Sequence, residues 1–561
     1  MCDFLRRSLA VLLWASIAAF GQTSAPSSPQ TPPPAASPDA NGYVGNQACA
    51  GCHSSIYNSY LKTSMAKASG LAIDNFIPAD FVHRKSGVHF RIYADEGKVW
   101  LGFERAKHPE VRGKRQLLYY IGSGRRGRSY LFAENGFLFE SPVNWYTDRR
   151  VWDMAPAYGN ASQIPMNLPA FTSCLHCHVS GLQPPIQGTQ NRYPTPPFLY
   201  SGVTCERCHG PGAAHTKGGA IVNPEKLDPE RRDAVCMQCH LEGKAAIERP
   251  GRHVYDYRPG QQLGDYIRYF VLADSQRGLG AVSQVEALAQ SACKKKSGDA
   301  MWCGSCHDPH YEPSAAERVS YYRQKCLECH GSKFGATHHT DQADCTACHM
   351  PASLSTDVAH TEVTDHRILR RPPVSPQLLQ DGNTRPALPR LVRFPDSQKA
   401  DDDVRDLALA WEALADGGMT AAAREAERLL RSAVEKSPND PALLSALGYS
   451  AQKKGDIDHA RELYEKALSV DPTLIDAATN LGVIDATRGH WREAVKLWED
   501  AFQRAPGQSR IGMNIARVLC EAGRTTDARD CVLRVLEFNP DLPEAKNLLQ
   551  HLNGSPPKCK D

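Results

Sequence analysis

The sequence predicts a mainly α protein with two regions: an N-terminal region with little regular structure and a small β insertion, and a C-terminal α-solenoid. Three observations lead to this prediction. A Cys-x-x-Cys-His motif occurs seven times within residues 42–371. Apolar and polar residues alternate in part of the segment 80–150, and prolines recur every 34 residues near the C-terminus.

Residues 1–21 have the features of a secretory signal. Arg6 and Arg7 precede the uncharged stretch 8–20, and Ala19 and Gly21 suit a signal peptidase, so we expect the mature chain to begin at Gln22. The stretch is shorter than the ~20 residues that span a bilayer, and no second long apolar run follows. We therefore expect an exported protein, in the periplasm or at the exterior of a bacterial cell, without an integral membrane segment in the mature chain.

Composition narrows the function classes further. The chain has 65 basic and 62 acidic residues, a net charge of +3, which argues against nucleic acid as a partner. Residues 22–41 are almost wholly Pro, Ser, Ala, Gln and Thr, a composition typical of a semi-extended linker. The informative part of the sequence therefore begins at residue 42.

Fourteen of the 19 cysteines belong to the repeated motif. The copies, named motifs 1 to 7 in chain order, have the cysteine pairs Cys49 and Cys52, Cys174 and Cys177, Cys205 and Cys208, Cys236 and Cys239, Cys303 and Cys306, Cys326 and Cys329, and Cys345 and Cys348. The histidines that complete them are His53, His178, His209, His240, His307, His330 and His349.

The spacing of the motif has a chemical reason. Two thiols separated by two residues form thioethers with the two vinyl groups of one haem, and the next imidazole binds the iron as its proximal ligand. Zinc ribbons need no histidine after each pair, thioredoxin-like sites use a single pair, and a disulfide framework would not repeat one spacing so strictly. The sequence therefore predicts seven covalently attached haem c groups.

The other cysteines carry less information. Cys2 lies in the predicted signal, and four further cysteines match no motif. Cys520 and Cys531 are candidates for a pair, but we expect buried free thiols here. The remaining two are Cys293 and Cys559.

Candidates for the sixth, distal ligand are histidines outside the motifs. His310 follows His307 by three residues and cannot reach the opposite face of its own haem, so it would serve a neighbouring one; the same logic applies to His215, six residues after His209. His360 and His366 lie in HTEVTDH, where no other motif explains two histidines. We expect these four to bind iron.

Further histidines are less clearly assigned. One of the adjacent His338 and His339 is expected to supply another distal ligand. His83, in an alternating segment, is equally compatible with a ligand and with a strand surface. We expect no iron binding from the remaining four, which are His89, His108, His176 and His253.

The segment from Tyr43 to about Arg371 resembles the multihaem cytochromes related to the tetrahaem nitrification cytochromes and hydroxylamine oxidoreductase. The resemblance rests on YVGNQACAGCHSSIYNSYLKTSMAKA, GSGRRGRSYL, CERCHGPGAAH, CGSCHDPH, CTACHMP and VTDHRI. It implies distal roles for His215, His310, His360 and His366. Relatives often have a histidine at the position of Met65, which makes Met65 a candidate ligand, and some carry one where this chain has Arg125 and Arg126.

The β insertion is predicted between motifs 1 and 2. Residues 88–94 and 98–103 alternate around Asp95-Glu96-Gly97, which predicts a hairpin, and further strands are expected at 129–132 and 136–140. Its many aromatic residues are expected to pack on porphyrin faces rather than to form a substrate pocket. The arginines of this segment, Arg125, Arg126 and Arg128, are expected to bind haem propionates.

The C-terminal region is predicted from its repeat length. After a Pro-rich connector at 372–402, residues 403–552 place a proline every 34 residues, the tetratricopeptide (TPR) period, and a short tail, 553–561, follows. Such stacks form a curved solenoid that typically holds a protein segment, and a structural or dimerising role is the alternative. The repeated prolines are Pro438, Pro472, Pro506 and Pro540.

Two functions agree with these features. Seven haems bound within residues 42–371 must lie close together. This favours an electron carrier whose redox partner is docked by the TPR region. The alternative is a multihaem oxidoreductase that acts on a small nitrogen or sulfur compound at a haem with an open or labile sixth position. The Cys-x-x-Cys-Lys motif of cytochrome nitrite reductases is absent and histidines are plentiful, so electron transfer is the favoured interpretation.

Overall fold

The computed structural model describes residues 41–106, 108–156, 158–159, 161–273, 280, 282–338, 344–355, 362–370, 388–395 and 404–559, without the side chains of 109, 332–338 and 362. The predicted signal, residues 22–40 of the linker and most of the 372–402 connector lie outside this part of the chain. In the described part, no helix combines the length and apolar character needed to cross a bilayer.

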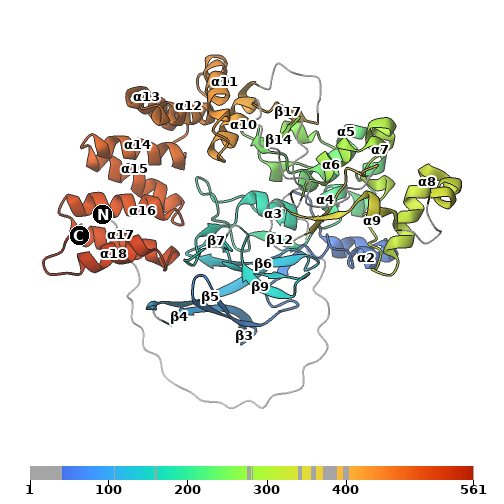
Figure 1. Ribbon diagram of the computed structural model, residues 1–561, viewed down its shortest axis with the longest axis horizontal. Helices are drawn as coiled ribbons and strands as arrows, with labels where there is room; N and C mark the ends of the chain where they lie inside the picture. The colour runs from blue at the N-terminus through green and yellow to red at the C-terminus, as the bar shows by residue number, and fades with distance from the viewer. Residues whose placement is uncertain are drawn as a thin grey trace, which may run out of the picture.

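The N-terminal region contains a ten-stranded sheet, so the prediction of little regular structure and a small β insertion was wrong in extent (Figure 1). Its central path runs β10-β7-β6-β5-β4-β3-β2, with β1 paired to β5 and the β8–β9 hairpin paired to β6. The strands are β1 (Ser69–Leu71), β2 (Ala79–His83), β3 (Val88–Asp95), β4 (Lys98–Arg105), β5 (His108–Ile121), β6 (Gly127–Glu134), β7 (Phe137–Glu140), β8 (Val143–Tyr146), β9 (Val151–Met154) and β10 (Leu168–Pro169).

Local alternation explains which strands the sequence revealed. Phe90 and Ile92 of β3 and Leu101 of β4 are buried at alternate positions, so the predicted hairpin stands out in the sequence. The register of β5 shifts between Leu117 and Tyr119, which interrupts the period of two along this strand. Strands of two to five residues, such as β1, β2 and β10, are too short to show any period.

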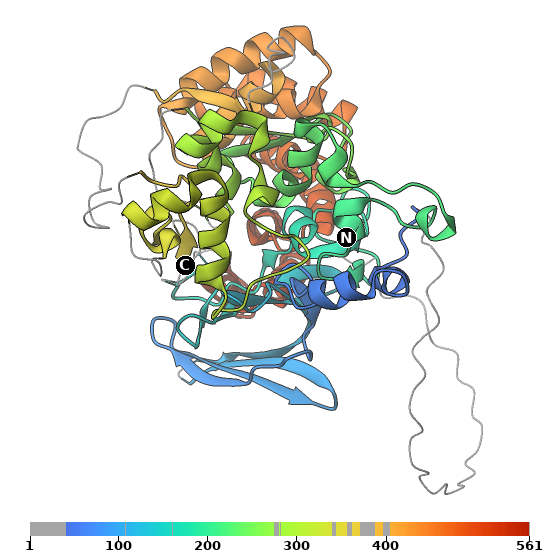
Figure 2. The same ribbon diagram turned by 90° about the vertical axis from the view of Figure 1, so that its right-hand side faces the viewer.

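Helices lie beside this sheet and carry most of the motifs, while motif 5 begins in a 3-10 turn at Cys303–Ser305 (Figure 2). The helices are α1 (Asn46–Ala50), α2 (Ser54–Tyr60), α3 (Thr172–His178), α4 (Glu206–His209), α5 (Pro229–His240), α6 (Gln284–Gln290), α7 (Ala292–Ser297), α8 (Arg318–His338) and α9 (Cys345–His349). Three small antiparallel sheets join them: β11 (Val179–Leu182) with β12 (Phe198–Ser201), β13 (Ala245–Glu248) with β14 (Ile267–Leu272) and β17 (Leu391–Phe394), and β15 (Ala352–Leu354) with β16 (Glu362–Thr364).

The C-terminal region consists of antiparallel helix pairs, as the 34-residue period predicts. Two of the pairs close where a glycine of the first helix meets an aromatic ring of the second: Gly448 meets Tyr464, and a Cβ on Gly482 would lie 2.4 Å from Trp498 Nε1. The helices are α10 (Val404–Asp416), α11 (Ala422–Lys436), α12 (Pro441–Lys453), α13 (Ile457–Val470), α14 (Ile475–Thr487), α15 (Trp491–Arg504), α16 (Ser509–Glu521), α17 (Thr525–Phe538) and α18 (Pro543–Leu552).

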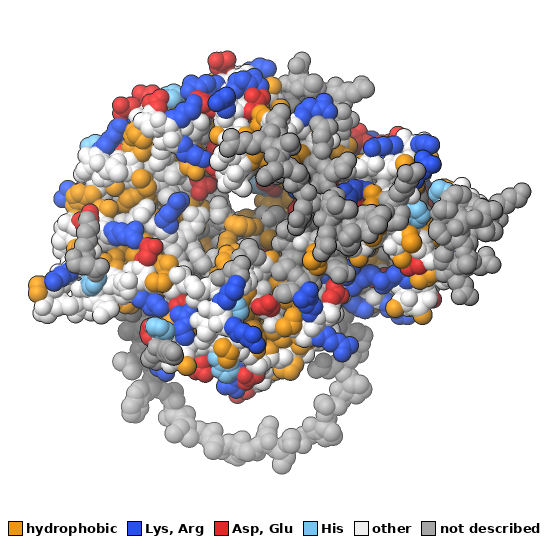
Figure 3. Space-filling model, in the orientation of Figure 1, with side chains coloured by type: hydrophobic (Ala, Val, Ile, Leu, Met, Phe, Trp, Pro, Cys, Tyr) orange, Lys and Arg blue, Asp and Glu red, His pale blue; other side chains and the backbone are white. Residues whose placement is uncertain are grey.

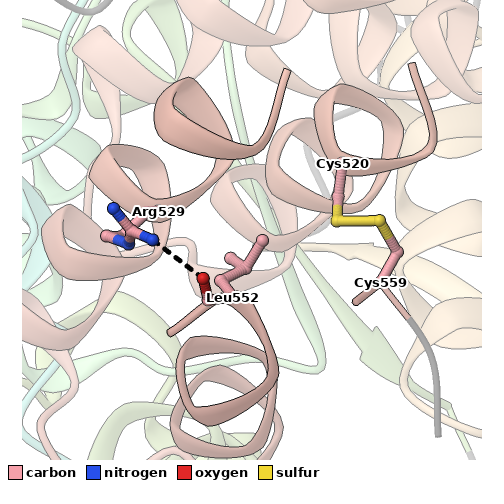
Figure 4. The surroundings of a disulfide bond; sticks show 4 residues. All are labelled: Cys520, Arg529, Leu552 and Cys559. Carbon is pink, nitrogen blue, oxygen red and sulfur yellow. Dashed lines mark hydrogen bonds between the residues drawn. A yellow bond between two sulfur atoms is a disulfide. The ribbon is translucent and has the colours of Figure 1, made fainter. Parts of the chain in front are cut away.

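A disulfide fastens the C-terminal tail to the solenoid (Figure 4). Cys520 of α16 pairs with Cys559, so the prediction of free thiols was wrong for these two residues. Cys531, the alternative partner of Cys520, is a buried free thiol. No sequence pattern indicates this pairing, because only the folded path of residues 553–558 brings Cys559 back to α16.

Replacing Cys559 with serine is expected to destabilise the solenoid by about 2–4 kcal/mol, because the bond closes a long loop in the unfolded chain. The linked residues are 39 positions apart. Urea unfolding of the oxidised protein measures the effect, and Cys293→Ser is the matched control because Cys293 is unpaired. A wild-type protein whose stability is unchanged by a thiol reductant would contradict this expectation.

The solenoid is anchored to the N-terminal region at its first helix. Asp406 of α10 is fully buried and lies 2.5 Å from Arg249, which follows β13, and 3.2 Å from Arg268 of β14. Arg405 contacts the same carboxylate at 2.7 Å and Asp440 at 2.6 Å. Because a buried carboxylate needs paired charges, these arginines fix the position of α10 against the small sheet.

A second anchor holds the other end of the solenoid. Asp541, 1% exposed, accepts two hydrogen bonds from Arg105 of β4, at 2.8 and 2.6 Å, and one from the backbone of Ile164 at 3.0 Å. Phe538 packs against Phe139 of β7 with 5.9 Å between ring centres. The solenoid therefore meets the N-terminal region at both ends, and an opening remains between the two regions (Figure 3).

Candidate haem-binding site

Helical geometry places the three functional side chains of each motif together. Positions i, i+3 and i+4 share one face of a helix, so both thiols and the imidazole point the same way. The backbone shows this turn directly: the amide of His209 donates to the carbonyl of Cys205 at 3.0 Å. His307 and Cys303 repeat the contact at 2.9 Å.

The seven motifs converge on one cavity of about 2850 Å³. All seven motif histidines line it, together with every motif cysteine except Cys174 and Cys348. Motifs separated by up to 300 positions therefore share one continuous space, which the sequence alone did not show.

Three motif histidines face a second histidine across this cavity. In each pair the two ring planes lie within 27° of parallel, and the ring centres are about 6 Å apart. The pairs are His53 with His215 (6.3 Å, 14°), His209 with His310 (5.9 Å, 13°) and His307 with His366 (6.3 Å, 27°).

This spacing fits an iron atom between the rings. A metal takes an imidazole nitrogen at about 2 Å and the ring centre lies about 1.1 Å behind it, so two axial imidazoles have centres about 6 Å apart. Aromatic rings in direct contact also have centres about 4.5–7 Å apart, so the distance alone does not decide. What favours iron is that each pair joins a motif histidine to a second histidine, and that all six rings line the cavity. The residues of motifs 1, 3 and 5 therefore fit six-coordinate haem with two histidine ligands.

Family comparisons agree with both regions of the chain. Residues 153–210, which contain motifs 2 and 3, match the model of cytochrome c554 and c-prime, and residues 296–335, which contain motifs 5 and 6, match a doubled CXXCH motif. Residues 441–474 and 485–552 match tetratricopeptide repeat models. The chain therefore combines a multihaem cytochrome c region with C-terminal TPR repeats. CXXCH motifs in such cytochromes bind haem c covalently.

The relatives of this multihaem cytochrome match it in parts. Multiheme cytochrome MtrA of Shewanella baltica is 25% identical over 185 residues, which cover 29% of this chain and 53% of that protein. Human tetratricopeptide repeat protein 7A is 29% identical over 120 residues, 21% of this chain and 14% of that protein. The chain thus spans at most about half the length of these relatives.

Two solved structures each cover about a quarter of this chain. A structure of MamA AMB-1 has 21% identity and a TM-score of 0.24, and covers 27% of this chain and 78% of that one. A structure from the functional characterization of Pseudomonas aeruginosa PilF has 25% identity and a TM-score of 0.24, over 27% and 68% of the two chains.

Backbone carbonyls orient several of the ring pairs in the cytochrome. Nδ1–H of His209 donates to Val222 O at 2.8 Å, and that of His349 to Leu369 O at 2.7 Å. The distal candidates do the same: His215 donates to Gly219 O at 3.0 Å and His366 to Thr364 O at 2.9 Å. With Nδ1 protonated, the lone pair lies on Nε2, the nitrogen available to iron.

Burial favours the neutral form of four imidazoles that line the cavity, because it lowers their pKa values. It lowers the pKa of His307 to about 4, and it lowers the pKa values of His178, His240 and His366 as well. A neutral imidazole has the free lone pair that binds iron, so near pH 7 the buried rings need no deprotonation before they bind. The hydroxyl of Tyr322, 3.2 Å from Nδ1 of His307, adds a partner that no sequence motif marks.

Sulfur contacts show which motifs are neighbours. Cysteine sulfurs of motifs 1 and 3, 2 and 4, 4 and 5, and 6 and 7 lie close to one another. Cys208 and Cys239 join motif 3 to motif 4, and Cys306 and Cys329 join motif 5 to motif 6, by electrostatic interaction. The motifs therefore form a row in the order 1-3-4-5-6-7, with motif 2 beside motif 4.

The other predicted ligands have different positions. Met65 lines the cavity, whereas His83 lies in β2, where its Nδ1 is 2.9 Å from Ser86 Oγ, and does not line it. His339 and His360 lie outside the described residues, and of His338 only the backbone, in α8, is described.

The arginines expected to bind propionates lie at or near the cavity. Arg125 and Arg126 line it, and they pair with Glu312 and Asp148 respectively. Arg128 does not line it and stacks 4.3 Å from the ring centre of Tyr120. The described geometry thus favours propionate contacts for Arg125 and Arg126 over Arg128.

The histidines expected not to bind iron do not line the cavity. His89, His108 and His253 pair with carboxylates at the surface. His176 lies between the two cysteines of motif 2 and is buried. It packs against Arg207, which lies between the two cysteines of motif 3.

Proposed function

We propose that this protein is an exported cytochrome that carries electrons along seven haems bound at motifs 1–7, and that its TPR region docks a redox partner. When bound, each haem supplies an Fe(III)/Fe(II) couple. The polypeptide supplies the thioether sulfurs, the proximal imidazoles and the distal imidazoles at His215, His310 and His366. His338, His339, His360 and Met65 remain candidates for the other distal positions, whereas His83, which does not line the cavity, fits its alternative role at the strand surface.

One observation carries this proposal: the histidines of all seven motifs line a single cavity. Haems held at such sites have no intervening domain to separate them, and contacts between sulfurs of successive motifs support short separations along the row. Two histidine ligands favour electron exchange with little rearrangement, which suits a carrier better than an enzyme.

Export is supported by two independent features. The sequence begins with the features of a secretory signal, and Cys520 pairs with Cys559 in the fold. Structural disulfides persist in oxidising compartments such as the bacterial periplasm and are rare in the cytosol. Partner docking is supported by the solenoid itself, because TPR stacks present curved surfaces to protein segments.

Intact mass of the protein, exported from a host that matures c-type cytochromes, tests the proposal. We expect the polypeptide mass plus seven haem groups, and one haem fewer for Cys49→Ala/Cys52→Ala. Cys293→Ala is the matched control, because Cys293 lines the same cavity outside any motif and should leave all seven haems attached. A mass equal to the bare polypeptide, or bound zinc in place of iron, would refute it.

A catalytic role is the second candidate, and one observation favours it. Among the described residues, no second histidine ring stacks opposite His178 or His240, the ligands of motifs 2 and 4. A haem with an open sixth position there would bind small nitrogen or sulfur compounds. High-spin ferric signals that cyanide or nitrite converts to low-spin would favour this function over electron transfer alone.

A further inference from the structure

The two residues between the cysteines of motif 3, Glu206 and Arg207, carry opposite charges. Haem attachment requires neither of them. Glu206 is 1% exposed, and its carboxylate accepts hydrogen bonds from three backbone amides. Val44 donates at 2.9 Å, Gly45 at 2.8 Å and Gly212 at 2.8 Å. Charge-assisted bonds of this kind hold the negative group in one place beside motif 1.

Arg207 places a positive charge on the other side of the same helix turn. Its guanidinium donates to the carbonyl of His176 at 2.9 Å and lies 3.1 and 3.2 Å from the ring nitrogens of that residue. Gln238, an inner residue of motif 4, donates to Arg207 O at 3.2 Å. Within the described part of the chain, no carboxylate pairs with Arg207, so its charge is not neutralised locally.

The two charges act on different haem attachment points. Val44 and Gly45, which hold the Glu206 carboxylate, lie just before motif 1, and this carboxylate is near the sulfurs of Cys49 and Cys205. The Arg207 guanidinium contacts His176, between the cysteines of motif 2, and is near the sulfurs of Cys177, Cys208 and Cys239. Motif 1 therefore experiences the negative charge, motifs 2 and 4 experience the positive one, and motif 3 lies between them.

We propose that Glu206 and Arg207 set a step in reduction potential across motif 3, so that electrons pass preferentially from the haem of motif 1 toward those of motifs 2 and 4. Both are positioning residues that act through the field at the haems, and neither binds iron. This inference rests on the proposed electron-transfer function and adds a direction to it.

The sign follows from Coulomb's law. Reduction lowers the positive charge on iron by one, so a nearby cation stabilises the reduced form and raises the potential, while an anion lowers it. One electron leaves the site at motif 1, which is oxidised from Fe(II) to Fe(III), and one electron reduces the site at motif 4 or 2. In a partly buried setting, one unpaired charge changes this equilibrium by about tenfold, or about 59 mV for a one-electron couple.

Potentiometric titration of the haem spectrum in the full exported protein tests the proposal. Arg207→Gln is expected to lower up to three of the potentials by about 59 mV, a tenfold change, and Glu206→Gln to raise up to two by a similar amount. Arg207→Lys keeps the charge and should retain the wild-type potentials. Arg231→Gln is the matched control, because Arg231 lies on α5 outside the cavity and is already paired with Asp228.

Three results would overturn the potential step: shifts of the same sign in both glutamine variants, no shift in either, or equal shifts in Arg207→Lys and Arg207→Gln. Haem content by intact mass is measured for each variant, and if Arg207→Gln fails to load its haems, Glu206→Gln and Arg207→Lys still decide the question. Titration of the wild-type protein tests electron transfer separately from the roles of Glu206 and Arg207. A wild type without reversible one-electron transitions refutes electron transfer itself, whereas normal transitions with unshifted variants refute only the roles of Glu206 and Arg207.

Discussion

Replacing His310 with alanine is expected to convert one of the haems from low-spin to high-spin, with the others unchanged. The ring of His310 stacks opposite that of His209 at 5.9 Å, so its loss leaves the iron at motif 3 without a sixth protein ligand. Ligand loss does not disturb attachment, because the thioethers form at Cys205 and Cys208. Ferric absorption and electron paramagnetic resonance should therefore report about one new high-spin haem per chain at full haem content.

Two controls sharpen this expectation. His108→Ala should leave the spectrum unchanged, because His108 is exposed on β5 and pairs with Glu110. Added imidazole should restore the low-spin signal of His310→Ala, since the cavity left by the side chain accepts the same ring. A variant that stays fully low-spin without added ligand would show that another residue caps the haem of motif 3.

The distal ligands show how far sequence reasoning reaches. Chain geometry predicts that His310 and His215 serve neighbouring haems, because neither can turn around its own porphyrin. The partners were not predictable: His310 faces motif 3, which lies about a hundred residues earlier, and His215 faces motif 1. Only the folded path of the chain brings these rings together, and no local pattern records it.

The sheet and the two anchors of the solenoid were only partly predictable from the sequence. Sequence alternation predicted the β3–β4 hairpin, but it missed β5, whose bulges break the period of two. Likewise, Asp406 and Asp541 look like ordinary helix-terminal acids in the sequence. Their importance arises from arginines that lie far away in the chain, on β4, after β13 and on β14.

The inner residues of the motifs were missed for a different reason. Haem attachment requires only the cysteines and the histidine, so Glu206, Arg207 and Gln238 had no assigned role in the sequence. The sequence does show two opposite charges inside motif 3. Their proposed role depends on which neighbouring motif each charge faces, and only the fold shows that.

Asp406→Asn is expected to destabilise the protein by about 3–5 kcal/mol, because it leaves buried guanidinium groups without their counter-charge. Arg268 is 8% exposed and Arg249 is partly buried, so water cannot replace the lost carboxylate. Urea unfolding followed by the helix signal measures the loss. Asp458→Asn is the matched control: Asp458 pairs with Arg488 on the solenoid surface and is 88% exposed, so its loss should cost at most about 0.5 kcal/mol.

The same variant distinguishes an anchored solenoid from a tethered one. If α10 is held only by its covalent connection, removing the charge of Asp406 would change stability no more than the surface control does. If the buried arginines hold it, the first TPR helix loosens while the second anchor, Asp541 with Arg105, keeps the far end in place. Combining Asp406→Asn with Asp541→Asn should then release the solenoid from the haem region, seen as a larger hydrodynamic radius at unchanged haem content, whereas either variant alone should leave the radius close to that of the wild type.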